Sequence, residues 1–90
     1  MGLASIPFGR WGRVTESEPG SFVLVERETA AGWKKPPPMD AVRIWMRRPG
    51  EPDDSDHNWT TWLHETDLPE WLSRFAIHEW LEPGAEPDWA

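Results

Sequence analysis

The chain has 90 residues, including eight tryptophans, with a formal net charge of −7 and no cysteine. The lack of cysteine excludes a disulfide framework and thiolate chemistry, and the negative charge argues against direct nucleic acid binding because phosphates would be repelled over most of the surface. We expect residues 1–90 to form a single small domain, with flexible ends at 1–9 and 83–90.

The N-terminal part has the pattern of a β-hairpin. Residues 10–16 form a candidate strand in which Gly12 marks a bulge or the close approach of another segment. Residues 18–21, EPGS, are typical of a type II turn, because Pro19 fixes φ at the second position and Gly20 accepts a positive φ at the third. Residues 21–27, SFVLVER, have apolar side chains on both faces, which predicts a central strand.

Residues 29–40, TAAGWKKPPPMD, form a connection between strands. Three consecutive prolines cannot donate ladder hydrogen bonds and favour a stiff extended loop. The segment contains neither P-x-x-P nor P-P-x-Y, so it lacks the usual signatures of a ligand for SH3 or WW domains.

A further strand is predicted at 42–48, where side chains alternate between two faces. One face carries three apolar residues that belong to the core: Val42, Ile44 and Met46. The other face places Trp45 between Arg43 and Arg47. Two interpretations of this face stay open: it holds an anionic ligand or partner, or the arginines shelter the indole and pair with the protein's own acidic half.

Residues 49–58, PGEPDDSDHN, form a polar loop. From Asp54 to Glu65 the polar residues have a spacing similar to that of an EF-hand calcium loop, but Trp59 stands where that loop needs glycine. The histidines could in principle gather with Asp56 around zinc, although their spacing does not require it. These histidines are His57, His64 and His78. We therefore predict no metal site and no cofactor.

The stretch 59–81 holds four of the eight tryptophans and is expected to supply most of the core. Residues 59–64 form either a short fourth strand, which we favour, or a one-turn helix. A helix is predicted over 67–75, with Asp67 as N-cap and Glu70 completing a capping box. Its apolar stripe consists of Leu68, Trp71, Leu72 and Phe75. Residues 76–81 either return as an edge strand, which we favour, or continue the helix.

These elements predict an α+β fold: a small antiparallel sheet of three to five strands with one C-terminal helix, about 67–75, packed on it. The sequence contains no H-E-x-x-H motif, no glycine-rich phosphate loop and no G-x-S-x-G turn. Without such a catalytic pattern, we expect a protein that is not an enzyme.

Charge is distributed unevenly along the chain. Residues 1–48 carry eight Lys and Arg against five acids, whereas residues 49–90 carry one Arg against eleven acids. Either the two halves pair within one fold, or the acidic half docks a basic partner protein. Trp and Arg are also the side chains most enriched at binding hot spots. We expect partner binding at Arg43, Trp45, Arg47, Asp53, Asp54, Asp56, Trp59, Trp62 and Glu65.

The predicted function is that of a small acidic protein-binding module, such as an inhibitor or immunity-type partner of a basic protein. The alternative is a small-molecule or glycan-binding module in which exposed tryptophan faces stack on the ligand. In size, charge and tryptophan content the chain resembles small acidic proteins of high-GC bacteria and their phages, some of which act as immunity proteins or inhibitors. No apolar run is long enough to cross a bilayer and no signal peptide is visible, so we expect a cytoplasmic protein.

Overall fold

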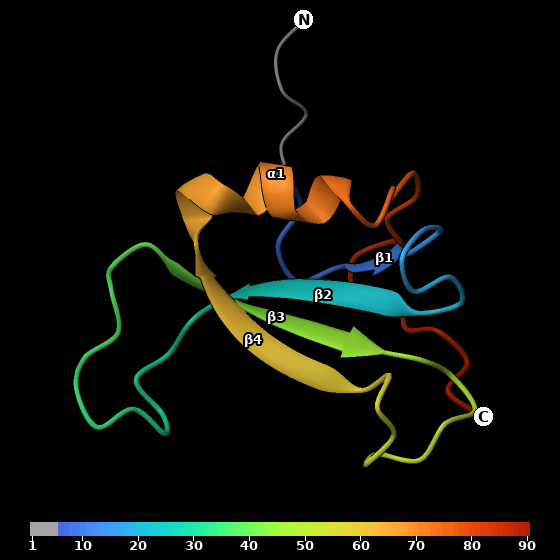
Figure 1. The fold of residues 1–90 in the computed structure, drawn as a ribbon, viewed down its shortest axis with the longest axis horizontal. Coiled ribbons are helices and arrows are strands. Elements are labelled where there is room, and N and C mark those ends of the chain that lie inside the picture. Colours follow the sequence, from blue (N-terminus) through green and yellow to red (C-terminus); the bar gives the residue numbers. More distant parts are fainter. Residues whose placement is uncertain (1–5) are drawn as a thin grey trace, which may run out of the picture.

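The structure, a computed structural model, describes residues 6–90. These residues form a four-stranded antiparallel sheet in the order β1-β2-β3-β4, with one helical segment packed across one face (Figure 1). The elements are β1 (Trp11–Arg13), β2 (Phe22–Arg27), β3 (Ala41–Arg47), β4 (Trp59–His64), the 3-10 turn η1 (Glu65–Asp67) and α1 (Leu68–Ser73). The predicted α+β fold, with a small sheet and one C-terminal helix, is confirmed.

The first two strands form the predicted hairpin. The N–H of Ser21 donates to the carbonyl oxygen of Glu18 at 3.1 Å, and Gly20 has a φ of +91°, as a type II turn requires. The close approach predicted at Gly12 is also confirmed, because the indole of Trp80 lies where a Cβ of residue 12 would stand.

The pairing register gives the sheet two different faces. On one face, Val23 pairs with Met46 and Val25 with Ile44, and all four residues are fully buried beneath the helical segment. We call this side the helix face. The opposite side, which we call the open face, carries no helix from residues 6–90. By strand alternation its side chains are those of Trp11, Arg13, Phe22, Leu24, Glu26, Ala41, Arg43, Trp45, Arg47, Thr60, Trp62 and His64.

The hydrophobic core lies between the helix face and α1. It consists of Val14, Val23, Val25, Val42, Ile44, Met46, Leu68, Leu72 and Phe75. Five of these nine residues come from β2 and β3, so the expectation that 59–81 supplies most of the core is wrong. The two central strands have a neighbour on each side and a helix above, which encloses their aliphatic side chains completely. The indoles of 59–81 lie at the margin of this core instead, where they are only partly covered.

The helical segment begins with η1 and continues as α1. The predicted stripe is confirmed, because Leu68, Leu72 and Phe75 are buried and Trp71 packs against them. The predicted capping box is wrong: Asp67 makes no side-chain cap hydrogen bond and has helical dihedrals, φ −89° and ψ −9°. The 3-10 turn runs directly into α1, so residue 67 lacks the extended conformation that a capping side chain needs. No helix in the described part of the chain is long and apolar enough to cross a membrane.

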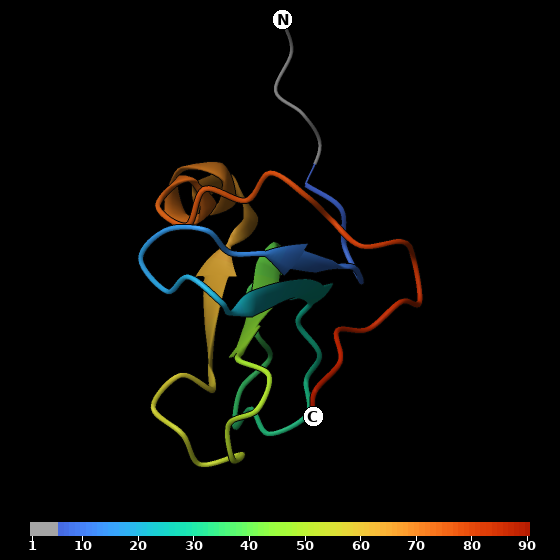
Figure 2. The same ribbon diagram turned by 90° about the vertical axis from the view of Figure 1, so that its right-hand side faces the viewer.

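After α1 the chain turns at Ala76, which has a φ of +48°, and runs back along β1. The N–H of Arg13 donates to the Glu79 carbonyl at 2.9 Å, and the N–H of Leu81 donates to the Trp11 carbonyl at 2.7 Å. The favoured return along the sheet edge is therefore confirmed, although as a single bridge between residues 12 and 80 and not as a regular strand. The chain's own backbone thus occupies the outer edge of β1 (Figure 2).

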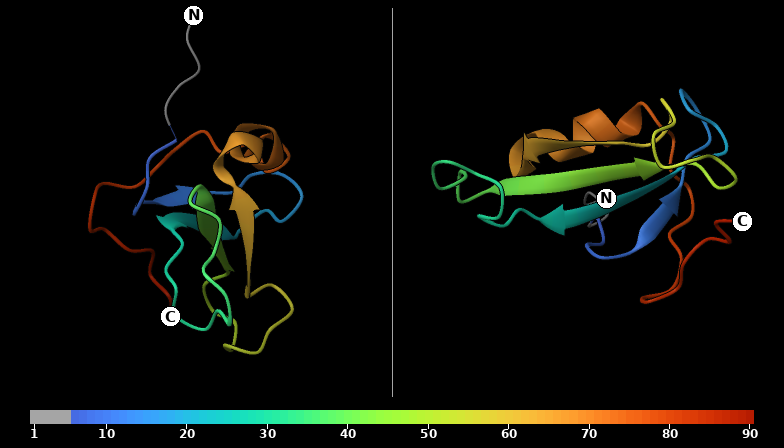
Figure 3. Two further views of the ribbon diagram at one scale, coloured as in Figure 1. Left: turned by 90° about the vertical axis from the view of Figure 1, so that its left-hand side faces the viewer. Right: turned by 90° about the horizontal axis from the view of Figure 1, so that it is seen from below.

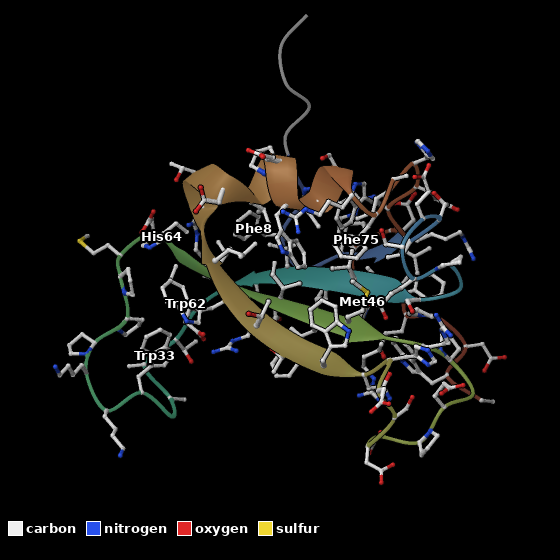
Figure 4. All side chains as sticks on the ribbon, viewed as in Figure 1. Phe8, Trp33, Met46, Trp62, His64 and Phe75 are labelled. Carbon is white, nitrogen blue, oxygen red and sulfur yellow. The ribbon has the colours of Figure 1, made fainter. Side chains whose placement is uncertain are left out.

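Both described ends of the chain contact the sheet. Ile6 and Phe8 pack against the core, and Phe8 lies between the sheet and the helix (Figure 4). Near the C-terminus, the ring of Trp89 lies 4.9 Å from that of Trp11 on the open face. Residues 1–5, part of the end expected to be flexible, lie outside the described residues.

Candidate functional site

Trp45 is the most exposed of the eight indoles. Its residue exposure is 39%, whereas the other seven tryptophans are half-buried and none is fully enclosed. The core of this small domain therefore leaves all eight indoles at least partly exposed. Trp45 lies near the middle of the open face, opposite Leu24 on β2 and Thr60 on β4. Its indole N–H donates to a carboxylate oxygen of Glu26 at 3.0 Å, which fixes the orientation of the ring.

Two depressions flank Trp45. One, of about 190 Å³, lies towards β4 and the 48–58 loop and includes Arg47, Asp53 and Thr60 in its lining. The other, of about 290 Å³, lies towards the start of the 28–40 loop and includes Glu26, Glu28 and Arg43. Trp45 lines both of them. A ligand or partner on this face would therefore contact the indole together with charged groups on each side.

The two arginines beside Trp45 are held by other groups and do not stack on its ring. The guanidinium of Arg47 lies 5.3 Å from the ring centroid of Trp89 and donates to Asp53 at 2.8 Å. Arg43 forms an ion pair with Glu28 and donates to the Thr60 hydroxyl at 3.3 Å. The arginines thus pair within the fold, with one acid from each half of the chain.

The ion pair of Arg43 is the least exposed one in residues 6–90, with side-chain exposures of 23% for Arg43 and 7% for Glu28. Desolvation would raise the pKa of Glu28. Hydrogen bonds from Arg43, the Thr29 N–H and the Trp33 indole outweigh desolvation and hold the pKa of Glu28 below its usual value. The carboxylate therefore stays charged and fixes Arg43 in the lining of the second depression.

The 49–58 loop carries two kinds of acid. Asp53 pairs with Arg47, whereas Asp54 and Asp56 are exposed and have no ion pair in residues 6–90. The helical segment continues this pattern with exposed Asp67 and Glu70, which also have no ion pair in that part of the chain. We call these four residues, Asp54, Asp56, Asp67 and Glu70, the acidic rim.

Within the same loop, Ser55, His57 and Glu51 lie close together without forming a catalytic triad. Nδ1 of His57 lies 3.2 Å from Glu51 and 3.5 Å from the Ser55 hydroxyl, and Nε2 lies 3.1 Å from Arg48. Because the guanidinium can only donate, Nε2 accepts and Nδ1 carries the proton, so the imidazole has no free nitrogen to deprotonate Ser55. Arg48 also donates to the Ser21 hydroxyl and the Pro19 carbonyl. The cluster therefore clamps this loop to the β1–β2 turn.

A hydrogen bond from Ser55, followed by one from His57, holds the pKa of Glu51 below its usual value. The loop is further closed by Asn58, whose side-chain oxygen accepts the Arg48 N–H at 2.9 Å and whose amide donates to the Pro52 carbonyl at 2.8 Å. These bonds give the acidic loop a defined shape, so Asp54 and Asp56 project from an ordered scaffold.

Trp59 and Trp62 lie on opposite faces of β4, and the structure does not bring them together. Trp59 stands on the helix face, 6.1 Å from the ring of Trp71. Trp62 stands on the open face beside Trp33 and His64, with ring centroids at 5.3 Å and 5.2 Å (Figure 4). Of these two indoles, only Trp62 shares a face with Trp45.

Glu65 lies just beyond β4 and pairs with Arg27 at 2.6 Å. Next to it, His64 lies 3.0 Å from Asp40, and this hydrogen bond holds the pKa of Asp40 below its usual value. These contacts join the end of β4 to β2, which lies beyond β3 in the sheet, and to the 28–40 loop. In the described residues, no three His, Asp or Glu side chains converge as a metal site would require.

The outer edge of β4 is a feature that the sequence analysis did not single out. The Glu65 N–H donates to the Asp40 carbonyl at 2.9 Å, which sets the alternation of the β3–β4 ladder. Residues 59, 61 and 63 then bond to β3, and the backbone groups of Thr60, Trp62 and His64 point outward. No backbone bond to these outward groups occurs in residues 6–90. Figure 3 shows β4 at the margin of the sheet, with α1 lying over it and no further strand beyond it.

Comparisons of this chain with protein-family models, curated proteins and solved structures find no match.

Proposed function

We propose that this chain is a protein-binding module without enzymatic activity, which docks a basic partner protein in the manner of an inhibitor or immunity-type protein. The observation that carries the proposal is the placement of Trp45. It is a 39% exposed indole on a sheet face without a helix, with a depression on each side. A large rigid aromatic that can be desolvated between two hollows is typical of a binding hot spot.

The charge of the surface favours a basic partner. The acidic rim leaves four exposed carboxylates without an ion pair in the described residues, and residues 49–73 contain seven acids and no Lys or Arg. Such a surface steers a positively charged protein and repels nucleic acid. The absence of cysteine fits a reducing compartment, so we place its site of action in the cytoplasm.

The second candidate function, binding of a small molecule or glycan, draws on the same indole. The depressions of about 190 Å³ and 290 Å³ are small for a ligand of drug size, for which pockets of about 300–1,000 Å³ are usual. A short sugar stacked on Trp45 would still fit this face. Titration with sugars and nucleotides, followed by tryptophan fluorescence, distinguishes the two functions, because a stacked ligand changes the emission of the exposed indole.

The protein-binding proposal is tested by retention on the immobilised full chain. A lysate of the source cell is applied at low and at moderate salt, and the retained protein is identified and purified. We expect a basic protein whose affinity falls by about tenfold or more for Trp45→Ala. Met39→Ala is the matched control, because Met39 is also exposed but lies outside the site.

Two results contradict the proposal. One is the retention of no macromolecule at either salt concentration. The other is equal loss of affinity for Trp45→Ala and Met39→Ala, because binding would then not depend on the open face.

A further inference from the structure

The two edges of the sheet differ in whether their outward backbone groups are hydrogen-bonded within residues 6–90. At the β1 edge, the outward N–H of Arg13 and the outward carbonyl of Trp11 are bonded by residues 79 and 81. At the β4 edge, the outward groups of Thr60, Trp62 and His64 have no backbone partner in residues 6–90. One edge is thus closed by the chain itself, and the other presents a row of donors and acceptors to solvent.

The open edge also lacks the features that normally prevent strand addition. Edge strands are commonly protected by lysine, by proline, by a bulge or by very short length. β4 is six residues long, WTTWLH, with no proline, no lysine and no acid, and its register with β3 is continuous. Tryptophan and threonine favour the extended conformation. Such a strand has a span of about 20 Å and is a complete template for another strand.

We propose that the β4 edge is the docking site of the partner, which adds an extended segment to the sheet by backbone hydrogen bonding to Thr60 and Trp62. This inference rests on the proposed function and names its binding mode. The added strand would extend the open face, so its alternate side chains would lie next to Trp62 and near Trp45.

Charge at the two ends of β4 identifies the chemistry of that segment. Asp54 and Asp56 lie in the loop that precedes the strand, and Asp67 and Glu70 lie in the helical segment that follows it. β4 itself has no acid and no Lys or Arg. A partner segment complementary to β4 therefore has β-branched or apolar side chains in its middle and carries Lys or Arg at both ends. We commit to such a basic-flanked strand of a different protein.

A second copy of this chain does not fit the same edge. If two β4 strands paired in antiparallel fashion, the acidic loop of one copy would face the Asp67–Glu70 turn of the other. If they paired in parallel, Asp54 and Asp56 would face their own equivalents. With no Lys or Arg between residues 49 and 73, both arrangements juxtapose like charges at each end of the added strand.

Two proline variants of the full chain remove outward N–H groups and leave the backbone hydrogen bonds between β3 and β4 in place. Thr60→Pro acts in the middle of the edge, and Thr60→Val is its control, because valine loses the hydroxyl but keeps the N–H. His64→Pro acts at the end of the edge, where the φ of −74° already matches proline, and His64→Ala is its control. Circular dichroism and thermal melting show which variants are folded. If Thr60→Pro does not fold, His64→Pro and its control His64→Ala are used for the test.

The probe is a synthetic peptide, Lys-Lys-Val-Thr-Val-Thr-Val-Lys-Lys, compared with the same peptide carrying glutamates in place of the lysines. Binding to the full chain is followed by NMR through the amide resonances of β4. We expect the lysine peptide to shift the Thr60 and Trp62 amides at submillimolar concentration, with at least about tenfold weaker binding of the glutamate peptide. We also expect at least about tenfold weaker binding to a folded proline variant than to its control.

The inference is overturned by any of three results. These are no binding of the lysine peptide at millimolar concentration, equal binding to a proline variant and its control, or formation of a dimer of the chain through β4. Failure of the edge is distinguishable from failure of the proposed function. Suppose that a basic protein from the lysate is retained and binds the proline variants with the same affinity as the controls. Docking at the β4 edge is then contradicted, whereas the proposed protein-binding function is not.

Discussion

Gly12 and Trp80 are in direct contact across the β1 edge. A Cβ built on Gly12 would stand 2.7 Å from Cε3 and Cζ3 of the Trp80 ring and 2.9 Å from Cγ2 of Ile77. Side-chain Cβ atoms do not approach other heavy atoms this closely, so Gly12→Ala must displace the indole and strain the bridge between residues 12 and 80. We expect it to lower the free energy of unfolding by about 1–3 kcal/mol in denaturant titrations.

A double-mutant cycle shows whether this contact is the cause. Trp80→Leu opens space at residue 12, so Gly12→Ala should cost clearly less in the Trp80→Leu background than in the wild type. Additive costs in the double variant would mean that the alanine acts elsewhere.

The ion pair between Glu28 and Arg43 should matter more than the one between Glu65 and Arg27. Glu28→Gln leaves the guanidinium of Arg43, 23% exposed, without its counter-charge, and we expect a loss of about 1–3 kcal/mol. Glu65→Gln breaks an exposed pair with side-chain exposures of 43% and 59%, so its cost should stay below about 1 kcal/mol. Chemical denaturation of both variants measures the two losses in the free energy of unfolding. A larger loss for Glu65→Gln than for Glu28→Gln would contradict the prediction.

Acid should destabilise the fold through three carboxyls. The pKa values of Glu28, Asp40 and Glu51 are held below their usual values of 4.5, 3.8 and 4.5 in the folded state. Their stabilising contribution is therefore present above those usual values and is lost as the pH falls through the lower folded values. We expect the free energy of unfolding to be level between about pH 7 and about pH 5 and to fall below about pH 4.5.

Urea titrations across that range measure this pH dependence. The decline should be shallower for Glu28→Gln, which removes one of the three titrating groups. A rise in stability on acidification would instead show that repulsion among the surplus acids dominates.

Trp89 should stabilise the domain although it is the penultimate residue. Its ring lies 4.9 Å from that of Trp11 and 6.3 Å from that of Phe22, and Arg47 lies over its face. We expect Trp89→Ala to cost about 1–3 kcal/mol, because a partly buried aromatic and its edge-to-face contacts are lost. Thermal melting measures the cost, and Pro83→Ala, an exposed position in the same tail, is the control. An unchanged melting temperature for Trp89→Ala would mean that the tail does not stabilise the sheet.

Much of the fold could be predicted from the sequence because its signals are local. The turn at 18–21, the alternation in 42–48 and the stripe of 68–75 each depend on neighbouring residues, and all three are confirmed. The capping box at Asp67 was wrong because the 3-10 turn runs directly into α1 and gives residue 67 helical dihedrals. The placement of the core was wrong for a different reason. Tertiary position decides which side chains are enclosed, and the central strands were enclosed in place of the indole-rich segment.

The candidate site was only partly accessible to the same reasoning. Spacing predicted that Arg43, Trp45 and Arg47 share a face, which the strand register confirms. It did not separate Trp59 from Trp62, because a one-turn helix over 59–64 would have placed both on one side, and only a strand puts residues three apart on opposite faces. It also could not show that Arg47 contacts Trp89 from the far end of the chain. The unpaired edge of β4 could not be predicted from the sequence either. The order of strands in the sheet decides which backbone groups remain without a partner, and local patterns do not give that order.

Residue-resolved amide exchange along β4 of the free protein is the most direct measurement of whether this edge is available to a partner. An unpaired edge predicts fast exchange at Thr60 and Trp62, slow exchange at Thr61 and Leu63, and slowing at Thr60 and Trp62 alone when the basic-flanked peptide is added. Uniformly slow exchange of all four amides in the free, monomeric protein would contradict it, because the edge would then already be covered.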